Sequence, residues 1–135
     1  MALAQQGKPD AARAAARAAV RLDEDAQRTA VTAARAALEK KADEVVVLDL
    51  RGVSGYTDYL VIGSGSSDRQ LEAVAEAVEK ELKTLGHKLV GSEGQRGGRW
   101  VLLDFGDVVV HVFHQDDRSH YDLEGLWADA PRVQV

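Results

Sequence analysis

The chain has 135 residues and 45% hydrophobic composition, which is enough for one domain with a self-sufficient core. It contains no Cys, which excludes disulfide bonds and any metal site or nucleophile built on Cys. No segment approaches the roughly 18 apolar residues of a membrane span, and the N-terminus lacks the apolar stretch of a signal peptide. We therefore expect a cytosolic protein that does not enter a membrane.

Charge is distributed unevenly along the chain. Residues 1–41 contain eight Lys and Arg against five Asp and Glu, whereas residues 42–135 contain nine against seventeen. The acidic body argues against nucleic acid as the main partner, because phosphate binding requires clustered cations. It suits a basic protein partner, although solubility alone explains such a charge equally well.

Residues 1–24 are predicted to be an extension, separate from a domain formed by residues 25–135. They are rich in Ala and Arg, and Pro9-Asp10 favours the start of a short helix through Val20. Large apolar side chains are few, so the segment has little surface with which to pack. We expect a loosely packed extension, and contact of its arginines with RNA is the alternative.

A second helix is expected from Asp23-Glu24-Asp25, which offer N-cap side chains, to about Lys41. Its apolar stripe is thin and consists of Ala30, Val31, Ala34, Ala37 and Leu38. Next, Val45–Leu50 has the β-branched composition of a buried strand, and Asp58–Gly63 is predicted to be another strand.

A strong helix follows this second strand. Ser67 and Gln70 have the spacing of a capping box at its start, and Gly86 ends it. Apolar residues recur between them at helical spacing, at Leu71, Val74, Ala75, Val78, Leu82 and Leu85. Beyond the helix we expect a short strand at His87–Val90 and a flexible loop at Gly91–Arg99.

Trp100–His114 is predicted to be a β-hairpin. Apolar residues run on both sides of Gly106-Asp107, and a Gly at the first central position favours a two-residue type II′ turn. This register makes one wholly apolar face from Val101, Leu103, Phe105, Val108, Val110 and Val112. The opposite face carries Trp100, Leu102, Asp104, Val109, His111 and Phe113. We expect part of this face to be available for contact with a helix or a partner. A short final helix is expected at Arg118–Trp127, capped by Asp116 or Asp117, with Pro131 marking the end.

Gly63–Ser67 lies between a strand and a helix and has the residue types of a phosphate-binding turn. It also resembles the glycine-serine entry of nucleotidyltransferases, which hold Mg²⁺ with paired carboxylates. That pair is missing, because His87–Gly91 contains no acidic residue, and helix capping alone explains the Ser and Gly. The alternative function is an enzyme that uses Ser64, Ser66 and Asp68 around a nucleotide phosphate.

His111 and His114 have opposite parity on a strand, so their rings face different sides of the sheet. We expect His111 to be a hydrogen-bonded histidine of the sheet, and we predict no catalytic residue, cofactor or metal. Trp100 is by default a core residue. Because its predicted face also carries Asp104, we favour an interface anchor instead.

Three stretches, in matching order, closely resemble the ribosomal silencing factor family, also called the Iojap-related family. They are VVVLDLRG, TDYLVIGSGSSDRQ and RWVLLDFGDVVVHVFHQDDRSHYDLEGLW. The resemblance covers roughly residues 26–128 and leaves out the Ala- and Arg-rich start. It implies an α/β fold with a single mixed β-sheet of about five strands flanked by helices. This topology is similar to that of nucleotidyltransferases, without their catalytic carboxylates.

The resemblance also implies a function that requires no enzymatic activity. Members of the family bind a ribosomal protein of the large subunit, number fourteen in the conventional count, on the face where the small subunit docks. They thereby keep the subunits apart and lower translation when nutrients are scarce, and they are often homodimers when free. The positions that the resemblance places at or beside this contact are Trp100, Asp104, Phe105, Gly106, Asp107 and Tyr121.

Overall fold

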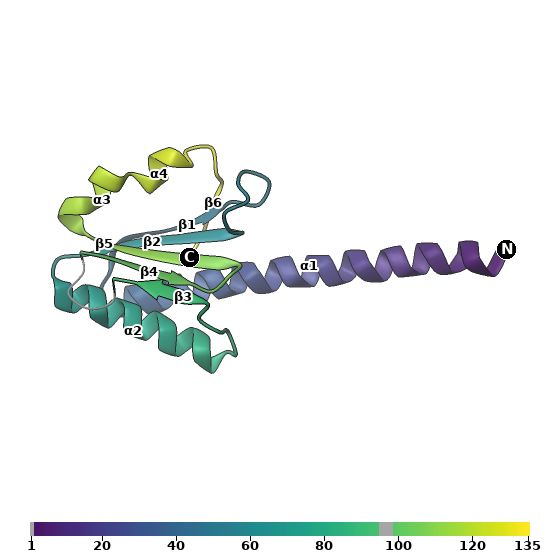
Figure 1. Cartoon of the computed structure of the whole chain (residues 1–135), viewed down its shortest axis with the longest axis horizontal. Coiled ribbons are helices and arrows are strands. Elements are labelled where there is room, and N and C mark those ends of the chain that lie inside the picture. Colours follow the sequence, from purple (N-terminus) through teal and green to yellow (C-terminus); the bar gives the residue numbers. More distant parts are fainter. Residues whose placement is uncertain (1, 95–98) are drawn as a thin grey trace.

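The computed structural model describes residues 2–94 and 99–135, without the side chains of residues 2–10, 18–23 and 121. In this part of the chain six strands form one mixed sheet, in the order β3-β4-β5-β2-β1-β6 (Figure 1). Their bounds are β1 Asp43–Asp49, β2 Tyr59–Gly65, β3 Gly91–Glu93, β4 Trp100–Asp104, β5 Val108–His114 and β6 Arg132–Val133. Strands β2 and β5 are parallel, and the other neighbouring pairs are antiparallel. The predicted α/β fold with a mixed sheet flanked by helices is confirmed.

Two strands differ from the prediction. The strand expected at His87–Val90 is absent, and β3 lies just beyond it, within the segment expected to be a loop. Gly86 (φ 89°) ends the preceding helix, and residues 87–90 carry the chain from there to the sheet edge. Residues 95–98 of the expected loop lie outside the described residues. Strand β6 was not predicted, because a two-residue strand after Pro131 has no readable period.

Helix α1 spans Ala2–Glu39 as one continuous helix, so the prediction of two helices was wrong. The chain contains no Gly or Pro between Val20 and Lys41, and the acidic residues at 23–25 are tolerated inside a helix. Pro9 lies within the helix and does not start it. The helix ends where Lys41 adopts φ 64°, and the Ala42 N–H donates to the Ala37 carbonyl at 3.1 Å.

The second half of α1 packs on the sheet beside α2 (Asp68–Thr84), and both helices cover the same face (Figure 1). The buried side chains of α1 are small, at Ala26, Ala30, Ala33, Ala34, Ala36 and Ala37. The expected stripe is therefore right for the alanines, whereas Val31 is only half-buried and Leu38 is 46% exposed. Because Ala has no long side chain, the helix axis can lie close to the strands.

Helix α2 begins and ends as its sequence predicts. The Ser67 side chain accepts a hydrogen bond from the Gln70 N–H, and Leu71, Val74, Ala75, Val78 and Leu82 are buried. The return bond of the capping box is shifted by one residue, because Gln70 Oε1 accepts from the Ser66 N–H at 2.8 Å. The predicted Leu85 lies at the C-cap and is 54% exposed.

The opposite face of the sheet is covered by α3 (Gln115–Tyr121) and α4 (Leu123–Leu126). A single helix from Arg118 to Trp127 was expected, but Asp122 adopts φ 44° and divides it. The Asp122 carboxylate accepts from the Gly125 N–H at 3.1 Å and so caps α4. His114, not Asp116 or Asp117, is the N-cap of α3. No helix among the described residues is long and apolar enough to span a lipid bilayer.

The hairpin has the predicted register. Leu103 pairs with Val110 and Val101 with Val112, and the Phe105 N–H donates to the Val108 carbonyl at 2.9 Å. Gly106 has φ 88°, as the turn requires, and its N–H donates to the Asp104 carboxylate at 2.8 Å. The predicted apolar face belongs to the core beneath α1 and α2. The other face joins a second core with Leu48, Leu50, Leu60 and Ile62.

Gly106→Val should destabilise the protein by about 1–2 kcal/mol, because a β-branched residue is strained at positive φ. A lower urea midpoint at unchanged slope is the expected result. Gly55→Val is the matched control, since Gly55 has no positive φ and no atom lies within 4 Å of its added Cβ. Equal midpoints for the two variants would contradict the turn assignment.

Candidate functional site

The face of the sheet that carries Trp100 is incompletely covered. Helix α3 packs on β5 and β2, whereas β4 and β3 extend beyond it toward the sheet edge. Register places side chains of β4 and β5 together there, with Trp100 beside Phe113 and Leu102 beside His111. We define the Trp100 face as Tyr56, Glu93, Trp100, Leu102, Asp104 and His111. Trp100, Leu102 and Asp104 are each half-buried, so their side chains pack partly within the protein and remain partly accessible to a partner.

A hydrogen-bonded chain of rings lies across this face. The Trp100 indole Nε1–H donates to His111 Nδ1 at 3.0 Å, and His111 Nε2 lies 3.2 Å from the Tyr56 hydroxyl. An indole N–H can only donate, so Nδ1 must be the acceptor and the neutral ring carries its proton on Nε2. Nε2–H then donates to the Tyr56 oxygen. The phenol proton is left to point toward a group outside this chain of rings.

Ring stacking holds the same residues in place. Trp100 stacks on His111 with centroids 5.7 Å apart and on Phe113 at 5.8 Å. Tyr56 stacks on Trp127 at 5.6 Å, with ring planes only 6° apart. Offset stacking of this kind adds about 0.5–1.5 kcal/mol per pair beyond the apolar area that it buries. The rings are therefore fixed before any partner arrives.

His111 is neutral at physiological pH. It is 4% exposed, and burial lowers the pKa of its imidazole to about 4. This confirms the prediction of a hydrogen-bonded histidine within the sheet. His114, on the opposite parity, instead caps α3. Among the described residues, no group of three or more His, Asp or Glu is arranged to hold a metal.

The electrostatic character of the Trp100 face is acidic. Burial raises the pKa of the Tyr56 hydroxyl, and the nearby charges of Asp104 and Glu93 raise it further. Tyr56 is nevertheless 47% exposed, so part of this residue is accessible to a partner, and both carboxylates lie near enough to affect its hydroxyl. An accessible aromatic group flanked by carboxylates suits a cationic, partly apolar partner surface.

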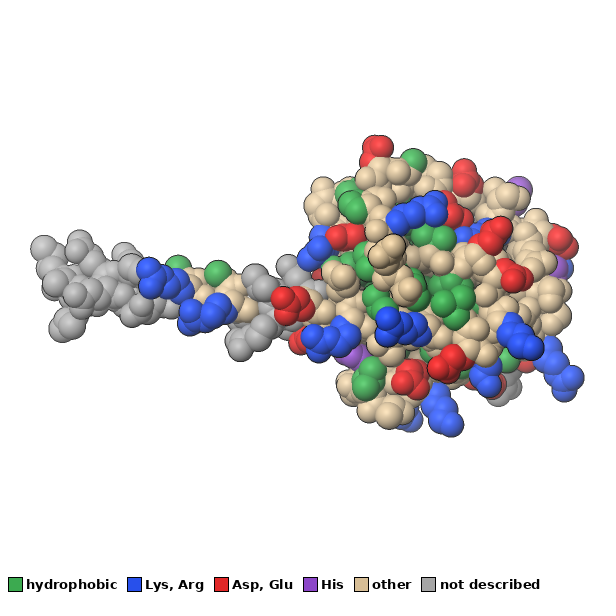
Figure 2. Space-filling view, turned by 180° about the vertical axis from the view of Figure 1, so that it is seen from behind, with side chains coloured by type: hydrophobic (Ala, Val, Ile, Leu, Met, Phe, Trp, Pro, Cys, Tyr) green, Lys and Arg blue, Asp and Glu red, His purple; other side chains and the backbone are tan. Residues whose placement is uncertain are grey.

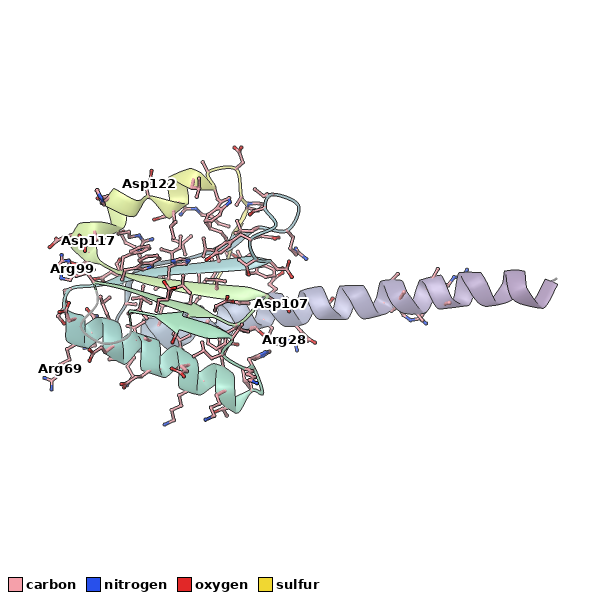
Figure 3. The ribbon with its side chains drawn as sticks, in the orientation of Figure 1. Arg28, Arg69, Arg99, Asp107, Asp117 and Asp122 are labelled. Carbon is pink, nitrogen blue, oxygen red and sulfur yellow. The ribbon has the colours of Figure 1, made fainter. Side chains whose placement is uncertain are left out.

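The predicted site residues do not all lie on one surface. Trp100 and Asp104 share the Trp100 face, but Phe105 packs against the core beneath α1 and α2. Gly106 and Asp107 form the exposed hairpin tip. Figure 3 shows Asp107 near the start of the packed part of α1, at the other end of the sheet from Arg99. The side chain of Tyr121 lies outside the described residues.

Sequence reasoning missed Tyr56 and Glu93. Tyr56 belongs to the loop between β1 and β2, which the Thr57 hydroxyl ties to the hairpin by donating to the Gly106 carbonyl at 2.9 Å. Glu93 lies on the edge strand β3, where it pairs with Leu102 of β4. Both positions depend on contacts between distant segments, and no local pattern marks either one.

The serine-rich segment before α2 is occupied by bonds within the chain. The Ser64 hydroxyl is buried and bonded to the Asp43 carbonyl and to Arg118, and the Ser66 hydroxyl lies 3.1 Å from Gln70 Oε1. Beside Ser64 lies a polar cavity of about 680 Å³, at whose wall the guanidinium of Arg118 is paired with Glu124 at 2.9 Å. These serines therefore contribute to helix capping and to a structural network.

A protein-family model described as "Ribosomal silencing factor during starvation" matches residues 23–135, which is most of the chain. The chain belongs to this family. It is 46% identical over 103 residues to the ribosomal silencing factor of Bacillus subtilis, covering 76% of this chain and 87% of that protein. A mouse protein named for mitochondrial assembly of the ribosomal large subunit is 36% identical over 92 residues, covering 66% of this chain and 40% of its own.

Solved structures of the family agree with the fold. A crystal structure of a protein from Chromobacterium violaceum superposes with a TM-score of 0.73 at 38% identity, covering 76% of this chain and 85% of that chain. The family and fold expected from the resemblance are thus confirmed. The family names describe regulators of ribosomes and indicate no enzyme activity.

Stability should fall as the pH is lowered from 6.5 toward 4, because only the unfolded protein protonates His111 in this window. The folded pKa is depressed, so the unfolded state binds more protons and the free energy of unfolding rises with pH. About 2–3 kcal/mol of stability should be lost by pH 4.5. Urea unfolding of wild type and His111→Gln at pH 7 and 4.5 measures this loss. Equal pH dependence in the two proteins would contradict a buried neutral imidazole, because His111 is the group that the variant removes.

Proposed function

We propose that this protein binds the large ribosomal subunit through the Trp100 face and blocks joining of the small subunit. By the resemblance to the family, the direct partner is the large-subunit ribosomal protein numbered fourteen. The observation that carries the proposal is the fixed, half-exposed aromatic chain with its acidic flank, in a member of the ribosomal silencing factor family. Such a protein acts in the cytoplasm and lowers translation when nutrients are limiting.

The Trp100 face has the features of a binding hot spot. Trp and Tyr are the residue types that contribute most at interfaces, and here both rings are held by stacking and hydrogen bonds. Since these rings are already ordered, little side-chain entropy remains to be lost on binding. Asp104 and Glu93 add charge complementarity toward a basic ribosomal protein, which favours fast association and selects against acidic partners.

Steric exclusion needs no chemical step. A bound domain prevents subunit joining if its site overlaps the footprint of the small subunit and if it stays bound long enough to compete. Residence time is set mainly by the dissociation rate, and a few desolvated anchors dominate that rate. The protein therefore requires no catalytic residue or cofactor for this role. A homodimer in the free state stays a prediction of the family resemblance.

Tyr56→Ala and Trp100→Ala should both weaken binding to isolated large subunits. Trp100→Ala should cost about 2 kcal/mol or more, equivalent to some thirty-fold in affinity, and Tyr56→Ala about 1–2 kcal/mol. Co-sedimentation with purified large subunits over a range of protein concentrations measures both effects. Thermal melts are needed in parallel, because Trp100 also packs against Phe113 and its removal lowers stability.

The control is Leu85→Ala, which removes an apolar side chain that is 54% exposed at the C-cap of α2. It should bind like wild type. Tyr56→Ala is the more discriminating variant because its exposed ring can be removed with a smaller effect on folding. Folded Tyr56→Ala and Trp100→Ala proteins that bind with wild-type affinity would exclude the Trp100 face as the contact.

A further inference from the structure

Helix α1 extends well beyond the body of the protein. Among the described side chains, the first buried one is Ala26, and residues 11–17 are all exposed. At 1.5 Å per residue, residues 2–25 reach about 35 Å from the point where the helix meets the sheet. Figure 1 shows this part of α1 running away from the strands and the other helices. Most helices in proteins are stabilised by packing of an amphipathic face, and the projecting part of α1 has no such packing within this chain.

The projecting helix carries arginine on one side. With about 100° of rotation per residue, Arg13, Arg17, Arg28 and Arg35 fall within about 60° of one another. The side of α1 that packs on the sheet, marked by Ala30, Ala33 and Ala37, lies roughly opposite. All four arginines are exposed. We call this set the arginine face of α1.

The charge of this face contrasts with that of the body. Residues 42–135 contain nine Lys and Arg against seventeen Asp and Glu, whereas residues 11–17 contain two arginines and no acidic residue. In Figure 2, blue side chains lie on the described part of the projecting helix, and the body shows both signs. Residues 2–25 as a whole contain four Lys and Arg and four Asp and Glu, and Glu24 falls on the same side of the helix as the arginines. Arg28, nearer the body, is paired with Asp25 at 3.5 Å. The separate cationic surface of the projecting helix is therefore the segment of residues 11–17.

The composition of residues 11–17 favours RNA over protein as the partner. Every residue there is Ala or Arg, so the segment lacks the large apolar or aromatic anchor that a protein interface requires. Binding to phosphate needs no such anchor, because cations that replace condensed counterions supply the affinity. The side chain of alanine is also small, so the helix backbone can approach a nucleic-acid strand closely.

We propose that the arginine face of α1 contacts the phosphate backbone of ribosomal RNA when the Trp100 face is docked on the large subunit. Arg13 and Arg17 make the contacts, and Arg28 and Arg35 extend the same side toward the body. This inference rests on the proposed function, because docking places the helix beside ribosomal RNA. The extension then adds a second, salt-dependent attachment to the specific contact, which lengthens residence on the subunit.

Replacing Arg13 and Arg17 by Gln should reduce the salt dependence of binding to large subunits. Each lost phosphate contact lowers the slope of log affinity against log salt by about 0.9, so the double variant should lose about 1.8. Between 50 and 200 mM salt, wild type should then weaken about tenfold more than the variant. Gln keeps a good helix propensity, so the helix itself is preserved.

The matched control is Lys80→Gln with Lys83→Gln, which removes the same charge from the exposed side of α2. Its slope should equal that of wild type. An Arg13→Gln, Arg17→Gln protein with the wild-type slope would overturn the proposed RNA contact. If Tyr56→Ala weakens binding as expected while the arginine variant binds with the affinity and salt slope of wild type, the proposed function stands and this inference fails.

A cross-linking experiment identifies the partner of the helix directly. The chain contains no Cys, so Ala16→Cys gives a unique attachment point for a photoreactive group beside the arginine face. After binding to large subunits and irradiation, the conjugate should shrink on ribonuclease treatment, and the control Glu76→Cys on α2 should give no such product. A cross-link that resists ribonuclease would show a protein partner and overturn the proposal, as would the absence of any cross-link in bound Ala16→Cys protein.

Discussion

The parallel pairing of β2 with β5 is the constraint on which the rest of the fold depends. Both strands are buried along almost their whole length, so each face of this pair must be covered. Helices α1 and α2 cover one face, and the short helices α3 and α4 cover the other. Helix α3 packs on the central strands β2 and β5, and it does not extend over the strands at the sheet edge. Strand β4, next to β5, therefore keeps its Trp100 side half-exposed.

This arrangement explains why the candidate surface is both rigid and accessible. His111 belongs to strand β5, which is buried along almost its whole length. Its ring accepts a hydrogen bond from Trp100 on the neighbouring strand and bonds to Tyr56 from a distant loop. Burial keeps the imidazole neutral, so it can serve as acceptor on one side and donor on the other. The central strand thus positions the exposed Tyr56 and the half-buried Trp100, which lie forty-four positions apart in sequence. A protein that acts by occupying a surface needs this kind of pre-organisation more than it needs reactive groups.

Strong local periodicity was sufficient to predict the central elements. The helical apolar spacing of α2, its Ser67 cap and the apolar runs on both sides of Gly106 predict a helix and a hairpin register that the structure has. The errors fall where the local signal is weak. Asp122 divides the last helix because it adopts a left-handed conformation, which Asp tolerates but which its sequence context does not predict. Strand β6 is too short to show a period. For the site, register placed Trp100 and Asp104 on one face, whereas Phe105 packs on the other side of the sheet and Tyr56 joins the site only through tertiary contacts.

The central claim is that this protein prevents the two ribosomal subunits from associating. Light scattering of purified small and large subunits, mixed after preincubation of the large subunits with increasing amounts of the full chain, measures this directly. We predict that the scattering rise of association is lost as the protein saturates the large subunit, and that preincubation with the small subunit alone has a weaker effect. Association at the normal rate and extent, with large subunits shown to be saturated, would contradict the account.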